Sequence, residues 1–204
     1  MNRIELVESI LPEYSKGIGV EVGSFKGEFA SEIVKRWDGT LFMIDVWREL
    51  GKEYIDTSNH INFEGGVYGE CMRNIKGFED RAIMIRATSE VASNFFEDDS
   101  LDFVYIDANH AYEFVRQDIN LWFPKVKKGG MVMGHDYLKM DWANPPFAEN
   151  GIDKHIWKND GKGDEFNIYA GIFGVNPAVN EFCISTGYSP NFTDEWFGTW
   201  YFKK

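Results

Sequence analysis

Short apolar runs recur along this chain, and each is followed by a stretch with helix-like spacing of apolar residues. Runs such as LFMI and FVYI are apolar at every position, as expected for strands of a parallel sheet that helices cover on both faces. The pattern predicts strands at 17–22, 40–44, 81–85, 101–106 and 130–133, with helices at 28–37, 67–75, 89–96 and 112–123. This alternation predicts an α/β fold with a doubly wound, mostly parallel sheet.

The ends of the chain extend this pattern, and two internal segments interrupt it. We expect a leading helix at 3–11 within residues 1–16, and a helix at 177–183 with a last strand at 196–202. Residues 48–66 give no clear prediction. Residues 138–170, with two adjacent prolines and several glycines, indicate an excursion over the site. With 204 residues, we expect a single domain, 1–204.

Charge and cysteine content narrow the class of protein. The chain has 33 acidic and 21 basic residues, a net charge of −12, which argues against a nucleic-acid partner. Two distant cysteines indicate a reducing compartment rather than a disulfide framework. No apolar run approaches the roughly 20 residues of a membrane span, and the first residues are too acidic for a signal peptide. We therefore expect a cytoplasmic protein with no membrane partner. The leading helix and the last strand are candidate contacts for a homo-oligomer.

Ligand-type side chains follow two of the predicted strands. Asp107 and His110 come after the strand at 101–106, and His135 and Asp136 come after the strand at 130–133. Neighbouring parallel strands deliver their carboxyl ends to one edge of the sheet, where such sheets bind ligands. We therefore expect one site, either a metal centre or an acid–base centre, beside a bound cofactor.

A glycine-containing turn joins the first strand to the next helix. Glu21 precedes it, and Gly23 and Gly27 let the backbone approach a ligand closely. A carboxylate here would repel a pyrophosphate and suit a cation such as an amino group or a sulfonium. Asp45 ends the second strand, where an acid typically binds ribose hydroxyls, and Trp47 could pack against a base or sugar. The alternative is that the glycines only make a tight turn and Asp45 only caps a helix.

These motifs resemble those of class I S-adenosylmethionine-dependent methyltransferases. The resemblance runs through VEVGSFKGEFA, LFMIDVW, IRATSEVA, SLDFVYIDANHAY, GGMVMGHDY and GTWYFKK, and it fails at 48–66 and 138–170. The chain is most similar to the small metal-assisted O-methyltransferases, which include catechol-type and sugar or macrolide enzymes. The resemblance implies a Rossmann-like, seven-stranded fold and S-adenosylmethionine as cofactor. The cofactor-binding residues that it implies are Glu21, Gly23, Ser24, Gly27, Asp45, Thr88, Ser89 and Asp107.

The chemistry of methyl transfer to a hydroxyl fits the residues after the fourth and fifth strands. His110 is a plausible base, and a divalent ion would lower the pKa of the hydroxyl and orient it. In the similar family, the acid at position 107 is a metal ligand, the residue three later is the base, and two adjacent acids complete the metal site. His135 replaces the first of those acids here. Asp107, His135 and Asp136 are then the expected ligands of Mg²⁺ or Mn²⁺, with Fe²⁺ or Zn²⁺ made more plausible by the imidazole.

Other interpretations stay open. His135 could instead bind the substrate or act as a second base, and His110 and Asp136 could have purely structural roles. A non-catalytic S-adenosylmethionine-binding module would look alike around the cofactor. A two-histidine, one-carboxylate iron oxygenase is disfavoured by the strand–helix alternation, and a nicotinamide oxidoreductase by the glycine pattern. We expect a small-molecule hydroxyl acceptor that is a sugar, polyketide-like or phenolic. Aromatic candidates for its pocket are Tyr54, Phe63, Trp142, Phe147 and Trp157.

Overall fold

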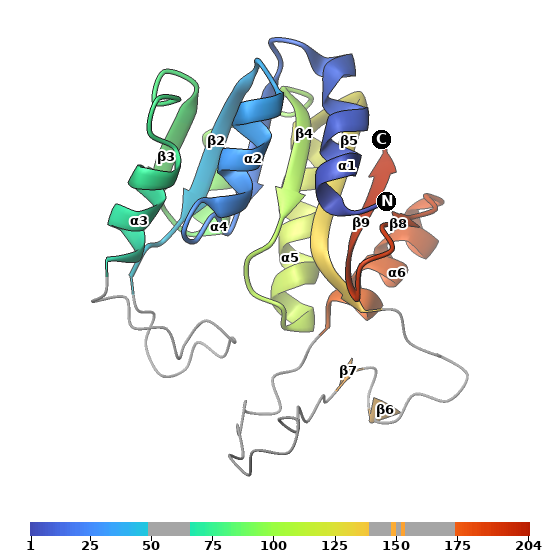
Figure 1. The fold of residues 1–204 in the computed structure, drawn as a ribbon. Helices are drawn as coiled ribbons and strands as arrows, with labels where there is room; N and C mark the ends of the chain where they lie inside the picture. The colour runs from blue at the N-terminus through green and yellow to red at the C-terminus, as the bar shows by residue number, and fades with distance from the viewer. Residues whose placement is uncertain (49–65, 139–147, 150–151, 154–173) are drawn as a thin grey trace.

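A seven-stranded sheet forms the centre of the molecule (Figure 1). The computed structural model describes residues 1–48, 66–138, 148–149, 152–153 and 174–204. In spatial order the strands are β3 (Ala82–Arg86), β2 (Thr40–Asp45), β1 (Ile18–Val22), β4 (Leu101–Ile106), β5 (Val126–Leu138), β9 (Phe197–Lys203) and β8 (Asn191–Phe192). The first five are parallel. Strand β9 is antiparallel to both neighbours, so β8 runs in the direction of β5. The expected mostly parallel, seven-stranded fold is confirmed.

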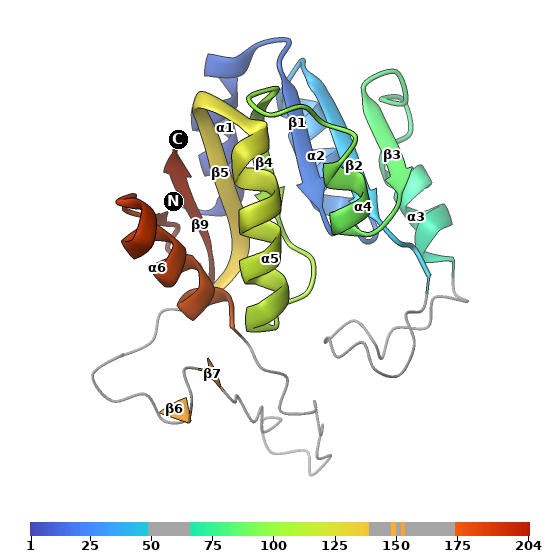
Figure 2. The same cartoon turned by 180° about the vertical axis from the view of Figure 1, so that it is seen from behind.

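Helices cover both faces of the sheet. Figure 1 shows α1 (Arg3–Ile10), α2 (Glu28–Arg36) and α3 (Val67–Asn74) on one side. Figure 2 shows α4 (Ser89–Ser93), α5 (Tyr112–Trp122) and α6 (Val175–Thr186) on the other. Two short 3-10 turns, Leu11–Tyr14 and Phe123–Lys125, follow α1 and α5. Within the predicted excursion, β6 (Ala148–Glu149) and β7 (Ile152–Asp153) form a two-residue antiparallel pair. The rest of that excursion and residues 49–65 lie outside the described residues.

Two hydrophobic cores follow from the alternation of side chains along each strand. In β4, Phe103 and Tyr105 pack with residues of α1 and α2, whereas Val104 and Ile106 pack with residues of α5 and α6. All four are buried. Fully burying one such side chain contributes about 1.5–3 kcal/mol, so a strand that is apolar on both faces is stable only between two helical layers.

Element boundaries differ from the sequence-based expectations where tertiary contacts decide them. Strand β5 is much longer than the predicted 130–133 because it begins at Val126, opposite Leu101 of β4, and pairs with β9 as far as Leu138. Helix α4 ends at Ser93 rather than at residue 96. Strand β8 was not predicted, since two residues carry no readable pattern.

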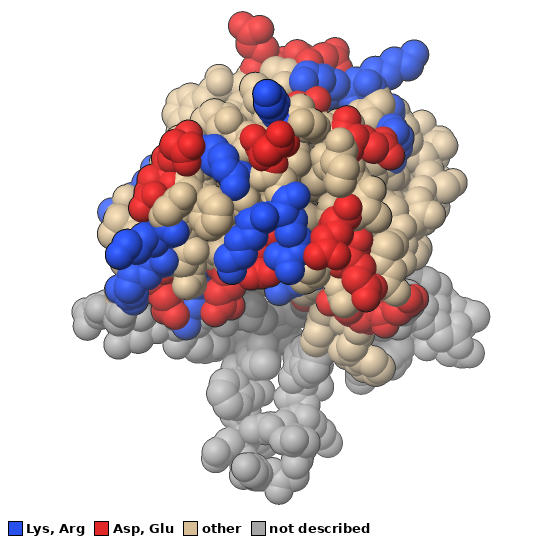
Figure 3. All heavy atoms as spheres, turned by 45° about the horizontal axis from the view of Figure 1, so that its top comes forward, with Lys and Arg blue, Asp and Glu red and all other residues tan. Residues whose placement is uncertain are grey.

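The strand order reverses between β1 and β4, and this point locates the site. At such a reversal the helices leave to opposite faces, and a crevice at the carboxyl ends of the strands is open to a ligand. Figure 3 shows the opposite end of the molecule, where basic and acidic side chains are interspersed. Ion pairs there include Lys127–Asp102 at 2.8 Å and Lys203–Glu13 at 2.9 Å. Within the described part of the chain, no helix has both the length and the apolar character to cross a bilayer.

Candidate active site

Two carboxylates and two imidazoles meet at the carboxyl ends of β4 and β5. Nε2 of His110 lies 2.7 Å from Oδ2 of Asp136 and 3.8 Å from Oδ1 of Asp107. Nδ1 of His135 lies 3.2 Å from Oδ1 of Asp136 and 3.9 Å from Oδ2 of Asp107. Between 16% and 22% of each side chain is exposed, so the group is accessible but largely desolvated. The expectation that the two strand ends form one cluster is confirmed.

An irregularity in β5 lets two adjacent residues reach this cluster. Successive residues of a regular strand point to opposite faces, so His135 and Asp136 would normally diverge. The pairing register with β9 shifts between Gly134 and Tyr137, and Asp136 has φ of +58°. Such a left-handed conformation at a residue other than glycine costs of order 1–3 kcal/mol and is concentrated at functional sites. The shift therefore re-aims side chains, as bulges beside active sites do.

The electrostatics of the cluster favour an ionised Asp136. Burial acts to raise the pKa of this carboxyl group, but contacts with His110 and His135 outweigh it and hold the pKa well below its usual range. For His135, burial acts to lower the pKa, and the hydrogen bond to Asp136 and the charge of Asp107 raise it overall. The site therefore attracts positive charge, either as a proton or as a metal cation.

The side chains also fit a divalent ion. One potential ligand atom from each of Asp107, His110 and Asp136 lies within 4.8 Å of the other two. Two carboxylate oxygens and an imidazole nitrogen suit Mn²⁺, Fe²⁺ or Zn²⁺ better than Mg²⁺. Geometry thus makes His110 a candidate ligand, a role that the sequence assigned to His135. Nδ1 of His135 is close to the same carboxylates, so its assignment as a ligand stays a prediction.

Glu21 is the clearest candidate for contacting a cationic ligand. Its side chain at the end of β1 is 2% exposed, and burial raises its pKa to about 8. Among the described residues, its Oε2 atom has no hydrogen-bond partner, and neither has the buried hydroxyl of Ser24. Leaving a buried carboxylate oxygen without a partner is costly, so this position suits a proton or a cation. An ammonium group, as in the methionine part of the expected cofactor, fits it.

The turn after β1 needs glycine at two positions. Gly23 has φ of +91°, and a Cβ atom there would lie 2.0 Å from the carbonyl oxygen of Asp107. Gly27 has φ of +71° at the start of α2, and a Cβ atom would lie 2.8 Å from Sγ of Cys71. Both positions disfavour a side chain for steric and conformational reasons. The close approach of Gly23 to Asp107 also joins this turn to the cluster of carboxylates and imidazoles.

Asp45 and Trp47 shape the neighbouring turn. The Asp45 carboxylate accepts hydrogen bonds from the backbone N–H groups of Phe25 and Trp47, at 2.8 and 2.7 Å. A role in binding ribose stays a prediction, since a carboxylate has further lone pairs to offer. The indole N–H of Trp47 donates to the Phe25 carbonyl at 2.7 Å, and the side chain is only 4% exposed. The suggestion that Trp47 packs on a base or sugar is therefore corrected: it belongs to the core.

Thr88 and Ser89 have different surroundings at the start of α4. Thr88 is exposed, and its hydroxyl accepts a hydrogen bond from Val91 N at 3.3 Å. The Ser89 hydroxyl donates to Asp118 and accepts from the indole N–H of Trp122, the latter at 2.8 Å. Asp118 is buried, which raises its pKa to about 7. Contact of either residue with adenine stays a prediction.

The sequence reasoning missed two supports of the site. Asp118 interrupts the apolar face of α5, and that interruption was the available signal. The N–H of Gly174 donates to the carbonyl of His110 at 2.7 Å, and a Cβ atom at 174 would lie 2.3 Å from Cα of Tyr112. No local pattern indicates this contact across 64 residues. The suggested acceptor-pocket aromatics lie outside the described residues: Tyr54, Phe63, Trp142, Phe147 and Trp157.

A known protein family matches the part of the chain that contains every predicted site residue. A family model described as "Methyltransferase domain" matches residues 20–137, more than half of the chain. Two curated relatives are both uncharacterised proteins. One, from Acanthamoeba polyphaga mimivirus, is 29% identical over 126 residues, covering 61% of this chain and 53% of its own length. The other, from Sinorhizobium fredii, is 29% identical over 96 residues, covering 47% and 10%. The chain thus spans about half, or far less, of these relatives.

Solved structures share the fold at low identity. A protein described as a candidate caffeoyl-CoA O-methyltransferase from Staphylococcus aureus superposes with a TM-score of 0.65 at 14% identity, covering 100% of this chain and 85% of that one. An O-methyltransferase family protein from Burkholderia thailandensis gives 0.64 at 12% identity, covering 98% and 55%. At these identities the likeness concerns the fold.

Proposed function

Since this chain belongs to the methyltransferase domain family, we propose that it transfers a methyl group from S-adenosylmethionine to a hydroxyl group of a small molecule. One observation carries the proposal. The cluster of Asp107, His110, His135 and Asp136 lies at the same sheet edge as Glu21, a buried carboxyl group whose Oε2 atom has no hydrogen-bond partner among the described residues. A site for a cationic ligand thus adjoins a site that can accept a proton.

The cofactor would occupy the switch point between β1 and β4. Glu21 would hold its ammonium group, beside the Ser24 hydroxyl and the turn from Gly23 to Gly27. Asp45 would bind the ribose, and Thr88 and Ser89 would border the adenine. When bound, S-adenosylmethionine supplies a methyl group on a positively charged sulfur, which departs as a neutral thioether carrying the electron pair of the broken carbon–sulfur bond.

His110 would take the proton of the acceptor hydroxyl as the new oxygen–carbon bond forms. A hydroxyl is a poor nucleophile until it loses that proton, and a positioned base typically contributes 10²- to 10⁴-fold. Asp136, 2.7 Å from Nε2, fixes the orientation of the His110 ring and stabilises the imidazolium that results. This is the role of a carboxylate in a histidine–carboxylate pair.

A divalent ion would assist in a second form of the proposal. Asp107 and Asp136 would bind it together with one imidazole, and the ion would lower the pKa of the acceptor hydroxyl. If His110 supplies the imidazole ligand, His135 is the remaining base. If His135 supplies it, His110 keeps the role of base. The ion would be Mn²⁺, Mg²⁺, Fe²⁺ or Zn²⁺.

Formation of S-adenosylhomocysteine tests the proposal. We would incubate the protein with S-adenosylmethionine and a panel of sugars, phenols and polyketide-like alcohols. We expect turnover with at least one acceptor class, and His110→Gln should lower it at least about 100-fold. Asp136→Asn should also lower turnover while leaving S-adenosylhomocysteine binding intact. Asp98→Asn, at an exposed ion pair with Lys125, is the carboxylate control. Full activity of His110→Gln and His135→Gln would contradict an acid–base role for the cluster.

Chelation separates the two forms. If a metal ion is required, EDTA should abolish turnover, and adding Mn²⁺ or Mg²⁺ back should restore it. Asp136→Asn should then weaken metal binding measured by calorimetry. Unchanged turnover in EDTA would leave the His110–Asp136 pair acting without a metal. Cofactor binding with no turnover on any acceptor would favour a non-catalytic binding module.

A further inference from the structure

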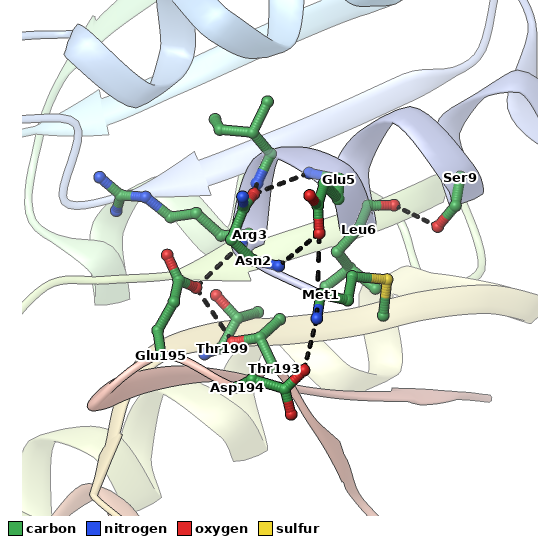
Figure 4. Close-up of polar contacts among 11 residues, drawn as sticks. Met1, Asn2, Arg3, Glu5, Leu6, Ser9, Thr193, Asp194, Glu195 and Thr199 are labelled. Carbon is green, nitrogen blue, oxygen red and sulfur yellow. Dashed lines mark hydrogen bonds and ion pairs between the residues drawn. The ribbon is translucent and has the colours of Figure 1, made fainter.

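Helix α1 begins with Arg3, at the same end of the sheet as the candidate site. Strand β9 starts opposite Leu138, at the carboxyl end of β5, so the turn before β9 lies at that end. In this turn, Glu195 accepts a hydrogen bond from the backbone N–H of Arg3 at 2.8 Å, and the N–H of Asp194 donates to the Met1 carbonyl at 2.9 Å (Figure 4). The start of α1 is thus fixed beside the site.

The Arg3 side chain extends away from Glu195, as Figure 4 shows. Its guanidinium carbon lies 4.7 Å from the centre of the Phe29 ring, and the Phe29 ring centre lies 4.5 Å from that of Tyr105. Phe29 is the second residue of α2, directly after the glycine turn, and Tyr105 is two residues before Asp107. The guanidinium group therefore lies between the cofactor turn and the polar cluster, and its charge acts on both Glu21 and His135.

This guanidinium has no carboxylate partner among the residues that the structure describes. Arg36 pairs with Glu8 and Glu32, and Arg116 lies 3.6 Å from Glu113, whereas Arg81 and Arg86 donate to backbone carbonyls. Arg3 is partly buried over the Phe29 ring and hydrogen-bonds the Tyr105 hydroxyl, an arrangement that positions the guanidinium, whose five N–H donors exceed these contacts. Glu21 is near enough for the Arg3 charge to favour its ionised form, and its Oε2 atom has no hydrogen-bond partner among the described residues.

We propose that Arg3 binds the carboxylate of the methionine part of the cofactor, while Glu21 binds its ammonium group. The inference rests on the proposed function and adds a binding residue to it. In an α-amino acid, the ammonium and carboxylate groups are attached to the same carbon atom. A site that binds both needs an anionic side chain for the ammonium and a cationic side chain for the carboxylate, close together but not paired with each other. Arg3 and Glu21 meet this requirement. Without Arg3, the nearby acidic groups Glu21, Asp45 and Asp107 would disfavour a bound carboxylate.

Calorimetry with two ligands isolates the carboxylate. S-adenosylhomocysteine carries the amine and the carboxylate, and its decarboxylated analogue keeps only the amine. Removing one partner of a desolvated charge pair typically lowers affinity about 10- to 1,000-fold. Arg3→Gln should lower the affinity for S-adenosylhomocysteine by such a factor and leave the affinity for the analogue within about twofold, whereas Glu21→Gln should weaken both ligands. Arg3→Lys should be intermediate, and Arg36→Gln, at the far end of α2, should change neither.

Equal effects of Arg3→Gln on the two ligands, or no effect on either, would overturn the assignment while leaving the proposed function standing. If the unaltered protein binds neither ligand, the proposed function itself fails. If Arg3→Gln does not fold, as judged by circular dichroism, the comparison is made with the unaltered protein and Arg3→Lys. The unaltered protein should prefer S-adenosylhomocysteine to the analogue at least tenfold, and equal affinity would contradict the inference.

Discussion

At the scale of single residues, Glu21 links the fold to ligand binding. Burial raises its pKa to about 8, so the carboxyl group is protonated in the free protein at pH 7. Binding of an ammonium group would favour the ionised form, so in the proposed complex Glu21 would give up its proton. The free-energy cost of burying the ionised Glu21 carboxylate would then be offset by the bound ammonium group.

This proton can be counted. At pH 7 we expect binding of S-adenosylhomocysteine to release close to one proton, because Glu21 changes from protonated to ionised; at pH 9 the release should be near zero. Calorimetry in two buffers with different ionisation enthalpies measures it. Glu21→Gln should release none and bind about 10- to 100-fold more weakly. Equal proton release by the variant and the unaltered protein would show that another group titrates.

Gly23 provides a test of the close approach between the cofactor turn and Asp107. Gly23→Ala would introduce a Cβ atom 2.0 Å from a backbone oxygen at φ of +91°, so we expect a loss of at least about 2 kcal/mol in the free energy of unfolding. Gly77→Ala is the matched control, since Gly77 has the same φ of +91° and no atom within 4 Å of the added carbon. Urea denaturation gives both values, and equal losses would mean that strain alone, not the clash, limits this position.

At the level of secondary-structure elements, the longer strands and helices could be predicted because the apolar pattern that specifies each one lies within its own sequence. Leu101–Ile106 and Tyr112–Trp122 each carry a pattern that suits burial between layers, and both were predicted within a residue. The left-handed conformation of Asp136 was not predictable, because it depends on how β5 pairs with β9 more than 60 residues later.

The candidate site was predictable to a similar extent. The rule that parallel strands end at one edge brings Asp107 and Asp136 together, and the structure confirms it. The rule does not say which nitrogen faces which oxygen, so it could not place His110 inside the group of potential metal ligands. It also could not show that the Trp47 side chain packs into the core, since that depends on Phe25 and Tyr68.

The helical layer formed by α4 and α5 contains a titratable link. Asp118 is buried, its pKa is raised to about 7, and its carboxyl group contacts the Ser89 hydroxyl. Between its unfolded pKa near 4 and its folded pKa near 7, the native state binds a proton that the unfolded chain has lost. The stability that this proton contributes is complete below about pH 4 and is lost as the pH rises through about 7.

Asp118→Asn should remove this pH dependence. Relative to the variant, the unaltered protein should gain a few kcal/mol in the free energy of unfolding, at most about 4, when the pH falls from 8 to 4. Urea denaturation at several pH values measures the difference. Asp98→Asn, at an exposed position, should leave the curve parallel to that of the unaltered protein. A difference between Asp118→Asn and the unaltered protein that stays constant with pH would show that Asp118 does not titrate in this range.

At the scale of the whole molecule, charge separates classes of partner. The chain carries a net charge of −12, and on the face shown in Figure 3 basic side chains are interspersed with acidic ones. Non-specific binding to nucleic acid depends on neutralising phosphates with lysine and arginine. We therefore expect no change in fluorescence polarisation of labelled single- or double-stranded oligonucleotides at 150 mM salt and protein concentrations up to about 50 μM. Saturable binding in that range would contradict a small-molecule acceptor as the sole substrate class.

The two cores and the switch point between β1 and β4 place Glu21, the glycine turn and the four-residue cluster at one end of the sheet. We propose that this end binds S-adenosylmethionine through Glu21, next to a base that acts on the acceptor. Calorimetric titration of the protein with S-adenosylhomocysteine tests it most directly. We expect saturable binding at one site with release of a proton at pH 7. No measurable binding by the folded protein would contradict it.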